Sequence, residues 1–183
     1  MIYTVECAFT DPAREDEWNL HYSGEKLDNL LRLPGWRTSQ RFRALTKIDA
    51  PYFAMHTLRD GGVLGGQYRS VGGGVFGGWE DKITNWHRNL FAGVDVAPEV
   101  TPERCLVVAT DATAAFRFPS LSFQWMEACG LDRSVAMLGI AIVDRAKALP
   151  QISPMRSAST RRSCRGRSRR SRWWISLKPA STP

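Results

Sequence analysis

The sequence of 183 residues contains no apolar run that approaches the roughly 20 residues needed to cross a bilayer. Its first residues also lack the basic flank and long apolar stretch of a secretory signal. We therefore expect a cytoplasmic protein without a membrane partner. Cysteine is scarce as well, and Cys7, Cys105, Cys129 and Cys164 are scattered without a C-x-x-C pair. This spacing predicts neither a disulfide framework nor a zinc site.

Acidic residues are absent from residues 156–183, which hold eight Arg and one Lys. The formal net charge of +7 is concentrated there, so the rest of the chain is slightly acidic. Because no apolar period would bury a face, residues 149–183 are predicted to form a basic, Arg- and Ser-rich disordered tail. Two interpretations of the tail stay open. It is either a nucleic-acid-binding arm in which Trp173 and Trp174 stack on bases, or the product of a frameshift in a GC-rich gene.

Residues 1–95 show the period-2 and helical patterns of six successive elements. These are a strand at 2–9, a helix from Asp11-Pro12 to Pro34-Gly35 with a kink or restart at Ser23-Gly24, strands at 37–44 and 52–58, a helical turn within the glycine-rich residues 61–78, and a strand at 83–91. The order β-α-β-β-α-β predicts an α+β protein with a ferredoxin-like antiparallel sheet and helices on one face.

Residues 96–148 begin the same pattern again and do not finish it. The predicted elements are a strand at 105–110, a helix at 119–129 and a strand at 134–143. The basic tail occupies the place of the missing helix and strand. Because a four-stranded sheet with helices on one side leaves its other face uncovered, we expect either a homodimer or an intramolecular pseudo-dimer.

Four short motifs carry a resemblance to a known family: Trp18-Asn19-x-His21-Tyr22, Leu30-Leu31, Pro34-Gly35-Trp36 and Gln40-Arg41-Phe42. Together they resemble the dimeric α+β-barrel superfamily, nearest its EthD-like and stress-responsive members, over residues 1–95. The resemblance implies two sheets paired into a barrel, here as tandem halves with a degenerate second copy. It implies little about function, because that superfamily includes several classes of enzymes and proteins without known activity.

A histidine late in the first helix is frequent in EthD-like proteins, and this chain has Glu25-Lys26 at the comparable stretch. The role of that histidine therefore does not carry over, and His21 is the nearest candidate at a different position.

The candidate catalytic residues are His87, His21, Tyr22 and Arg41. His87 comes first because Asn85, His87 and Asn89 would share one face of a strand, and a polar face costs free energy unless it is solvated or lines a polar pocket. Histidine also exchanges protons near neutral pH. The alternative is a solvated His87 at a sheet edge.

No metal and no cofactor is predicted. The three histidines lack metal-ligand spacing, and residues 72–78 lack the lysine of a phosphate-binding loop. Three hypotheses follow: an enzyme that uses metal-free acid/base chemistry on an aromatic or polyketide-like compound between sheet and helices, a non-catalytic stress-response or binding module, or a nucleic-acid-binding protein that acts through its tail.

Overall fold

The computed structural model describes residues 1–74, 77–116, 118–152 and 172–176. The elements of the first half are β1 (Ile2–Phe9), α1 (Glu15–His21), a π-helical turn (Tyr22–Lys26), α2 (Leu27–Leu31), β2 (Trp36–Ala44), β3 (Tyr52–Leu58), α3 (Gly66–Ser70) and β4 (Ile83–Ala92). Those of the second half are β5 (Arg104–Ala109), α4 (Ala112–Ala115), β6 (Gln124–Leu131), β7 (Met137–Asp144), α5 (Arg145–Ile152) and β8 (Arg172–Ser176). Among the described residues no helix is long and apolar enough to span a membrane.

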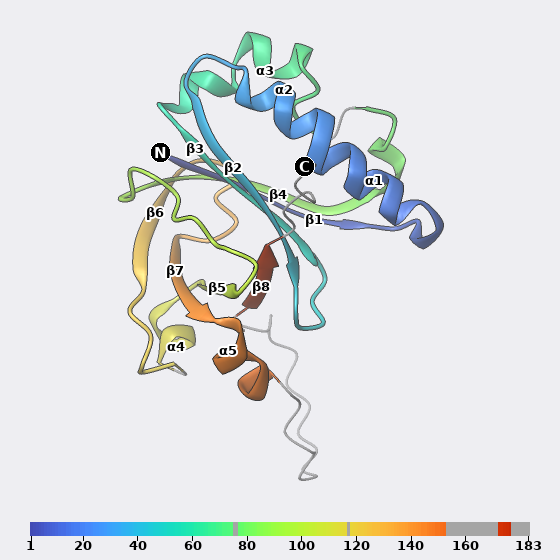
Figure 1. The fold of residues 1–183 in the computed structure, drawn as a ribbon. Helices are drawn as coiled ribbons and strands as arrows, with labels where there is room; N and C mark the ends of the chain where they lie inside the picture. Colours follow the sequence, from blue (N-terminus) through green and yellow to red (C-terminus); the bar gives the residue numbers. More distant parts are fainter. Residues whose placement is uncertain (75–76, 117, 153–171, 177–183) are drawn as a thin grey trace.

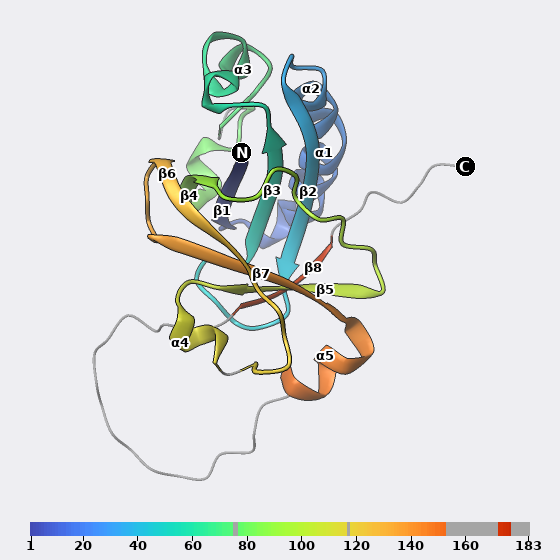
Figure 2. The ribbon, with the colours of Figure 1, turned by 90° about the vertical axis from the view of Figure 1, so that its left-hand side faces the viewer.

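The strands form one closed antiparallel barrel in the order β1-β3-β2-β8-β5-β7-β6-β4. The first half contributes the run β2-β3-β1-β4 and the second half the run β6-β7-β5-β8. The two runs meet where β4 pairs with β6 and where β2 pairs with β8. Figures 1 and 2 show the strands of the first half crossing those of the second at a steep angle. The predicted α+β barrel is therefore confirmed, and it closes within one chain.

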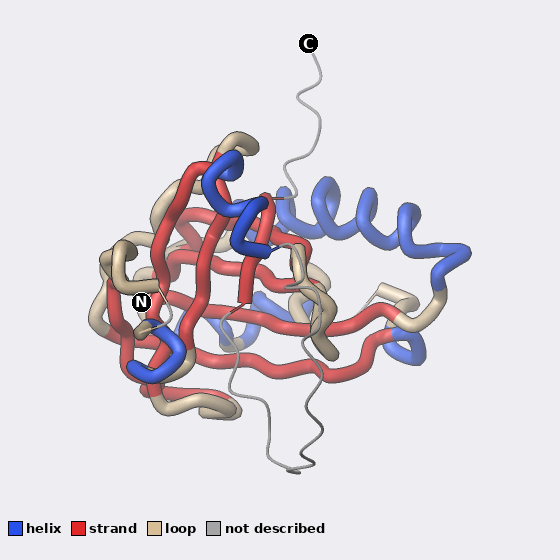
Figure 3. The backbone as a smooth tube through the Cα atoms, turned by 90° about the horizontal axis from the view of Figure 1, so that it is seen from below, coloured by secondary structure: helices blue, strands red, loops and turns tan. Residues whose placement is uncertain are grey.

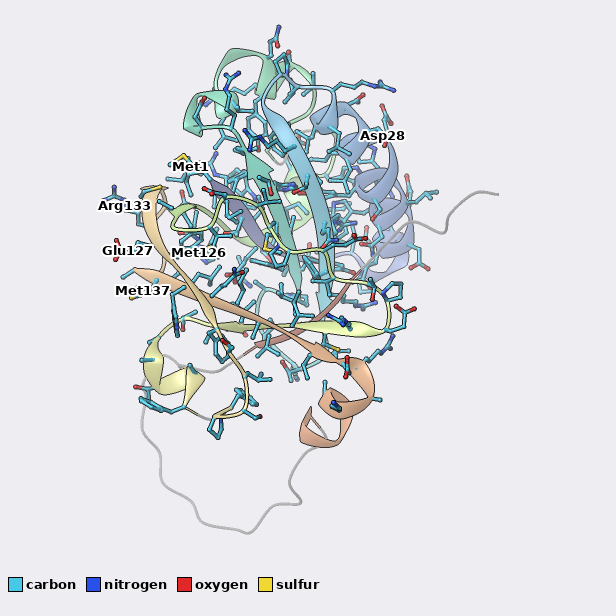
Figure 4. The ribbon with its side chains drawn as sticks, turned by 60° about the vertical axis from the view of Figure 1, so that its left-hand side comes forward. Met1, Asp28, Met126, Glu127, Arg133 and Met137 are labelled. Carbon is cyan, nitrogen blue, oxygen red and sulfur yellow. The ribbon has the colours of Figure 1, made fainter. Side chains whose placement is uncertain are left out.

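Alternation along the strands divides the apolar side chains into two layers. One set fills the barrel and comes from both halves, with Ile2, Phe42, Phe53, Phe91, Leu106, Met126 and Leu138 among its members. Figure 4 shows Met126 on the barrel side of β6 and its neighbour Glu127 on the outside. The other set lies between the first sheet and the helices α1 and α2, which cover the outer face of that sheet (Figures 1 and 3).

The connection between the two halves is held by polar side chains of the first sheet. The backbone N–H of Ala97 donates to the hydroxyl of Thr57 at 2.9 Å, and that of Val100 donates to the amide oxygen of Gln40 at 3.2 Å. Val100 is fully buried in the barrel core. Val100 therefore anchors the connection, most of which is exposed, to the barrel core ahead of β5.

The helix predicted at residues 119–129 is wrong, because residues 124–131 form β6 between β4 and β7. Along β6, Met126 is buried and Glu127 is exposed, which is the alternation of a strand. Trp125 lies against Gly139 of β7, where a Cβ atom would come within 2.8 Å of the indole ring. Ladder bonds on both edges override the near-helical spacing of the aromatic residues.

Two stretches of the predicted tail have regular structure. Helix α5 extends to Ile152, and Arg172–Ser176 forms β8, which pairs with both β2 and β5. The second half thus contains the helix and strand that the sequence pattern lacked, and the expectation of disorder is wrong for these residues. A Trp-Trp-Ile run suits a strand, which explains this outcome. Residues 153–171 and 177–183 lie outside the described residues, so the nucleic-acid and frameshift hypotheses stay predictions.

Candidate functional site

The layer between the first sheet and its helices is unusually aromatic. Tyr3, Val5 and Cys7 face it from β1, because alternate residues of a strand share one face. Trp18 and Tyr22 extend into this layer from the first helical segment, and their rings pack edge to face with centroids 5.8 Å apart. Such pairs add roughly 0.5–1.5 kcal/mol beyond the area that they bury.

A small cavity opens inside this layer. Its volume is about 20 Å³, room for about one water molecule. Its walls are mostly apolar and aromatic, and its polar lining is basic or nucleophilic. The lining residues are Val5, Cys7, Trp18, His21, Tyr22, Lys26, Gly74, Trp79, Ile83 and Trp86.

The π-helical turn positions two of these residues. Tyr22 and Lys26 begin and end the turn, and both are buried because residues four apart lie on the same face of a helix. A π turn inserts one extra residue into the helix, and such turns are frequent at functional sites. The predicted kink at Ser23-Gly24 is therefore present as a π turn, and Lys26 at the end of that turn is buried.

Lys26 has only 7% of its surface exposed. Its ammonium nitrogen donates to the carbonyl of Gly74 and lies 4.6 Å from the centre of the Tyr22 ring. Burial lowers the pKa of Lys26 to about 8, and the nearby Arg41 charge acts in the same direction. The Cys7 thiol and Glu80 oppose this shift without reversing it.

Arg41 is a second buried cation, with 3% of its surface exposed. Its guanidinium donates to the Ser23 hydroxyl at 2.8 Å and to the Asn19 side-chain oxygen at 3.0 Å, and it lies 4.0 Å from the centre of the Tyr22 ring. Burial lowers the pKa of Arg41. Among the described residues, no carboxylate forms an ion pair with Arg41 or Lys26. Both cations are therefore buried in this layer without an ion-paired carboxylate among the described residues.

Gly74 links the cavity to a pair of buried tyrosines. Its N–H donates to the Tyr68 hydroxyl at 2.8 Å, and that hydroxyl lies 2.9 Å from the Tyr3 hydroxyl. Burial raises the pKa of both tyrosines, so their hydroxyls stay protonated. Because its carbonyl accepts from Lys26 at the same time, Gly74 is held at both backbone groups.

His56 forms a separate buried cluster behind these tyrosines. Its Nδ1 lies 2.8 Å from the Ser39 hydroxyl, which also accepts the indole N–H of Trp36 at 2.8 Å. Its ring stacks on Tyr3 with a centroid distance of 5.5 Å. Burial lowers the pKa of His56 to about 3, and Lys26 and Arg41 add to that shift. His56 is therefore neutral in the folded protein and does not line the cavity.

A search of solved structures matches this architecture to the crystal structure of an anthrone oxidase-like protein. The TM-score is 0.58 and the sequence identity is 12%, over 100% of this chain and 96% of that one. The two proteins share a fold. At this identity the likeness extends to the α+β barrel alone. A scan against protein-family models gives no match, and a search of curated proteins gives none either.

The barrel brings three of the four predicted site residues together. His21 and Tyr22 line the cavity, and Arg41 lies against the Tyr22 ring on the side of Ser23 and Asn19. His21 Nδ1 lies 3.6 Å from a carboxylate oxygen of Glu25.

His87 is not part of this group. It pairs with Glu6 across the β1–β4 ladder and is exposed, on the same face of β4 as the barrel residue Phe91. The neighbouring Trp86 lines the cavity in its place. His87 and Asn89 share one face of β4 as predicted, but that face is the barrel side and not the side of the helices. Asn85 is separated from them by a bulge, where it has a positive φ of 49° and the β1–β4 register shifts. Asn89 is buried and bonds to Ser134.

Lys26 is the functional candidate that the sequence did not single out. A lysine in a helix is expected to be solvated, and the packing of the helix against the first sheet shows that this one is buried. Its four-residue spacing from Tyr22, on the same helix face, was the available signal. Within the described part of the chain, no group of three or more His, Cys, Asp or Glu side chains is arranged to hold a metal ion.

Proposed function

We propose that this protein is a small-molecule enzyme that abstracts a proton from an aromatic, polyketide-like compound bound between the first sheet and helices α1 and α2. One observation carries the proposal: His21 and Lys26 both line a cavity whose other walls are largely aromatic. Ligand sites are typically apolar concavities with a few convergent polar groups. Anthrone, the compound in the name of the structural neighbour, belongs to this substrate class.

His21 is the base in this proposal. Its Nδ1 faces Glu25, so Nε2 is the atom assigned to take the proton, and the carboxylate stabilises the imidazolium that results. The substrate keeps the electron pair of the broken bond and becomes an enolate or phenolate. The Lys26 ammonium favours that anion, and Arg41 adds its charge from behind Tyr22. Tyr22 and Arg41 are positioning residues.

The size of the cavity determines how a substrate enters. Room for about one water does not accommodate a fused ring system. A substrate therefore has to displace Gly74 from Lys26, and its oxygen then replaces the Gly74 carbonyl as the acceptor of the lysine hydrogen bond. This exchange selects compounds with an oxygen at the end that enters first.

The test measures proton abstraction directly, as deuterium uptake from D2O at the acidic methylene carbon of anthrone, followed by NMR under nitrogen. We expect the protein to accelerate the exchange and His21→Gln to reduce that acceleration by about 100-fold, because a positioned acid or base contributes roughly 10²–10⁴ in rate. The folded fraction of each variant is checked by circular dichroism.

His87→Gln tests the competing assignment with the same change of chemistry. Loss of exchange in His87→Gln together with full exchange in His21→Gln would overturn the role of His21. Binding of anthrone without any accelerated exchange would instead identify the non-catalytic binding module.

We also propose that each half is a ferredoxin-like unit of the EthD-like or stress-responsive type. The strand runs β2-β3-β1-β4 and β6-β7-β5-β8 support this, because each places its second, third, first and fourth strands in the same order. The barrel of the single chain then corresponds to the pseudo-dimer rather than to a homodimer.

A further inference from the structure

Lys26 differs from the other lysines of the described chain in its surroundings. Lys47 and Lys147 are exposed, and Lys82 is half-buried and pairs with Asp81. Lys26 is buried, lines the cavity and has no acidic partner there. Its environment therefore disfavours the ammonium form, which needs water or a carboxylate for stability.

The contacts of the Lys26 nitrogen suit a nucleophile. The hydrogen bond to the Gly74 carbonyl uses an N–H of the amine and orients it. A neutral amine that donates this bond keeps its lone pair free for attack. The Tyr22 ring flanks the nitrogen at 4.6 Å and the cavity adjoins it, so a small molecule that enters the cavity meets the amine.

We propose that Lys26 is a nucleophilic amine that forms an imine with an aldehyde or ketone whose carbonyl group reaches this cavity. The nitrogen lone pair attacks the carbonyl carbon, a C–N bond forms, and the C=O π electrons move to oxygen, which takes a proton. The nitrogen then loses its protons, a C=N bond forms, and the oxygen leaves as water. His21, on the same cavity wall, supplies the proton that the departing oxygen needs.

The proton affinity of Lys26 agrees with this geometry. With a pKa of about 8, roughly a tenth of the amine is neutral at pH 7, against fewer than about one in a thousand for a solvated lysine. Only the neutral amine attacks a carbonyl carbon, so burial raises the reactive fraction by about 300-fold.

This inference rests on the proposed function in that both use the same cavity, and it deepens that function by naming carbonyl compounds as the substrate class. In the imine the Lys26 nitrogen is bonded to the substrate and withdraws electrons from the neighbouring carbon, which makes a proton there easier to abstract. For carbonyl substrates it thus stabilises the anion through this bond and not as a separate ammonium. The same cavity would then hold both the group that activates the substrate and the base that deprotonates it.

The experiment traps the imine. The full chain is treated at pH 7 with limiting formaldehyde, a carbonyl compound close to water in size, and with cyanoborohydride, which reduces an imine to a stable methylamine. Peptide mapping by mass spectrometry then gives the initial rate of methylation at each lysine. We expect Lys26 to react at least about tenfold faster than the exposed Lys47 and Lys147, in line with its larger neutral fraction. Equal or slower methylation of Lys26 would overturn the proposal.

Two variants complete the test. Lys26→Arg should abolish the rapid methylation of the protein, whereas Lys47→Arg, a matched change at an exposed site, should leave it unchanged. Rapid methylation that persists in folded Lys26→Arg would belong to another group and would overturn the proposal. The anthrone exchange assay separates the two claims. Rapid methylation of Lys26 without accelerated deuterium exchange would support the imine and overturn the proposed function. Accelerated exchange without rapid methylation of Lys26 would support the proposed function and overturn the imine.

Discussion

Lys26 and Arg41 introduce charge into a layer that is otherwise built from aromatic and aliphatic side chains. Burying a charge without an acidic partner costs free energy, and cation–π contacts with Tyr22 recover only part of it. For Lys26 the shift from 10.5 to about 8 corresponds to roughly 3 kcal/mol. A residue that destabilises the fold by this amount fits a chemical role better than a structural one.

At this scale we predict that Lys26→Met raises the free energy of unfolding at pH 7 by about 1–3 kcal/mol, because an apolar side chain of similar length replaces a buried charge. Between pH 8 and 10.5 the unfolded chain binds the lysine proton and the folded chain does not. The free energy of unfolding of the parent protein therefore rises with pH in this window, and its difference from that of Lys26→Met becomes smaller.

Urea unfolding at pH 7 and pH 9.5 measures both effects. Lys47→Met, at an exposed position, is the control and should change stability by less than about 0.5 kcal/mol at either pH. If the free energies of unfolding of Lys26→Met and the parent differ by the same amount at both pH values, the burial of the amine is contradicted.

At the scale of single elements, β8 joins the two halves. Its residues pair with β2 through Phe42, Arg43 and Ala44, and with β5 through residues 105–108. Without β8, both neighbouring strands would present unpaired N–H and C=O groups to solvent, which favours association with other chains.

We predict that a chain ending at Ser171 is less stable than the full chain by at least about 3 kcal/mol, because it loses two ladders of backbone hydrogen bonds. Thermal unfolding followed by circular dichroism measures the difference. A chain ending at Ser176 keeps β8 and is the matched control. Equal melting temperatures for the two truncated chains would show that β8 does not close the barrel in solution.

At the scale of the whole molecule, the barrel core depends on both halves. Phe42, Phe53 and Phe91 of the first half pack in one cluster with Leu106 and Met126 of the second. Neither half buries its share of this cluster alone, so the two halves should unfold together as one cooperative unit.

We predict that residues 1–95 expressed alone self-associate, because their sheet would expose the aromatic face that the second half covers. Size-exclusion chromatography with light scattering measures the mass, and the full chain, whose barrel is closed, is expected to be a monomer. A folded, monomeric fragment at high concentration would count against the shared core.

The sequence by itself determined the local features whose signals lie within a few residues. Alternation predicted β1 to β4, the Asp11-Pro12 start and the Pro34-Gly35 turn bounded the first helical segment, and Ser23-Gly24 marked the irregular turn. It also named His21, Tyr22 and Arg41 as candidates together with His87, and the structure places the first three in one layer. What only the tertiary structure decided depends on partners distant in the chain. Strand β6 took its conformation from β4 and β7, and β8 from β2 and β5. The tertiary structure also decided that the helices cover the face of β4 that carries Trp86 and not the face that carries His87, and that Lys26 lies in the covered layer. Which face of a strand or helix is covered depends on the elements that pack against it.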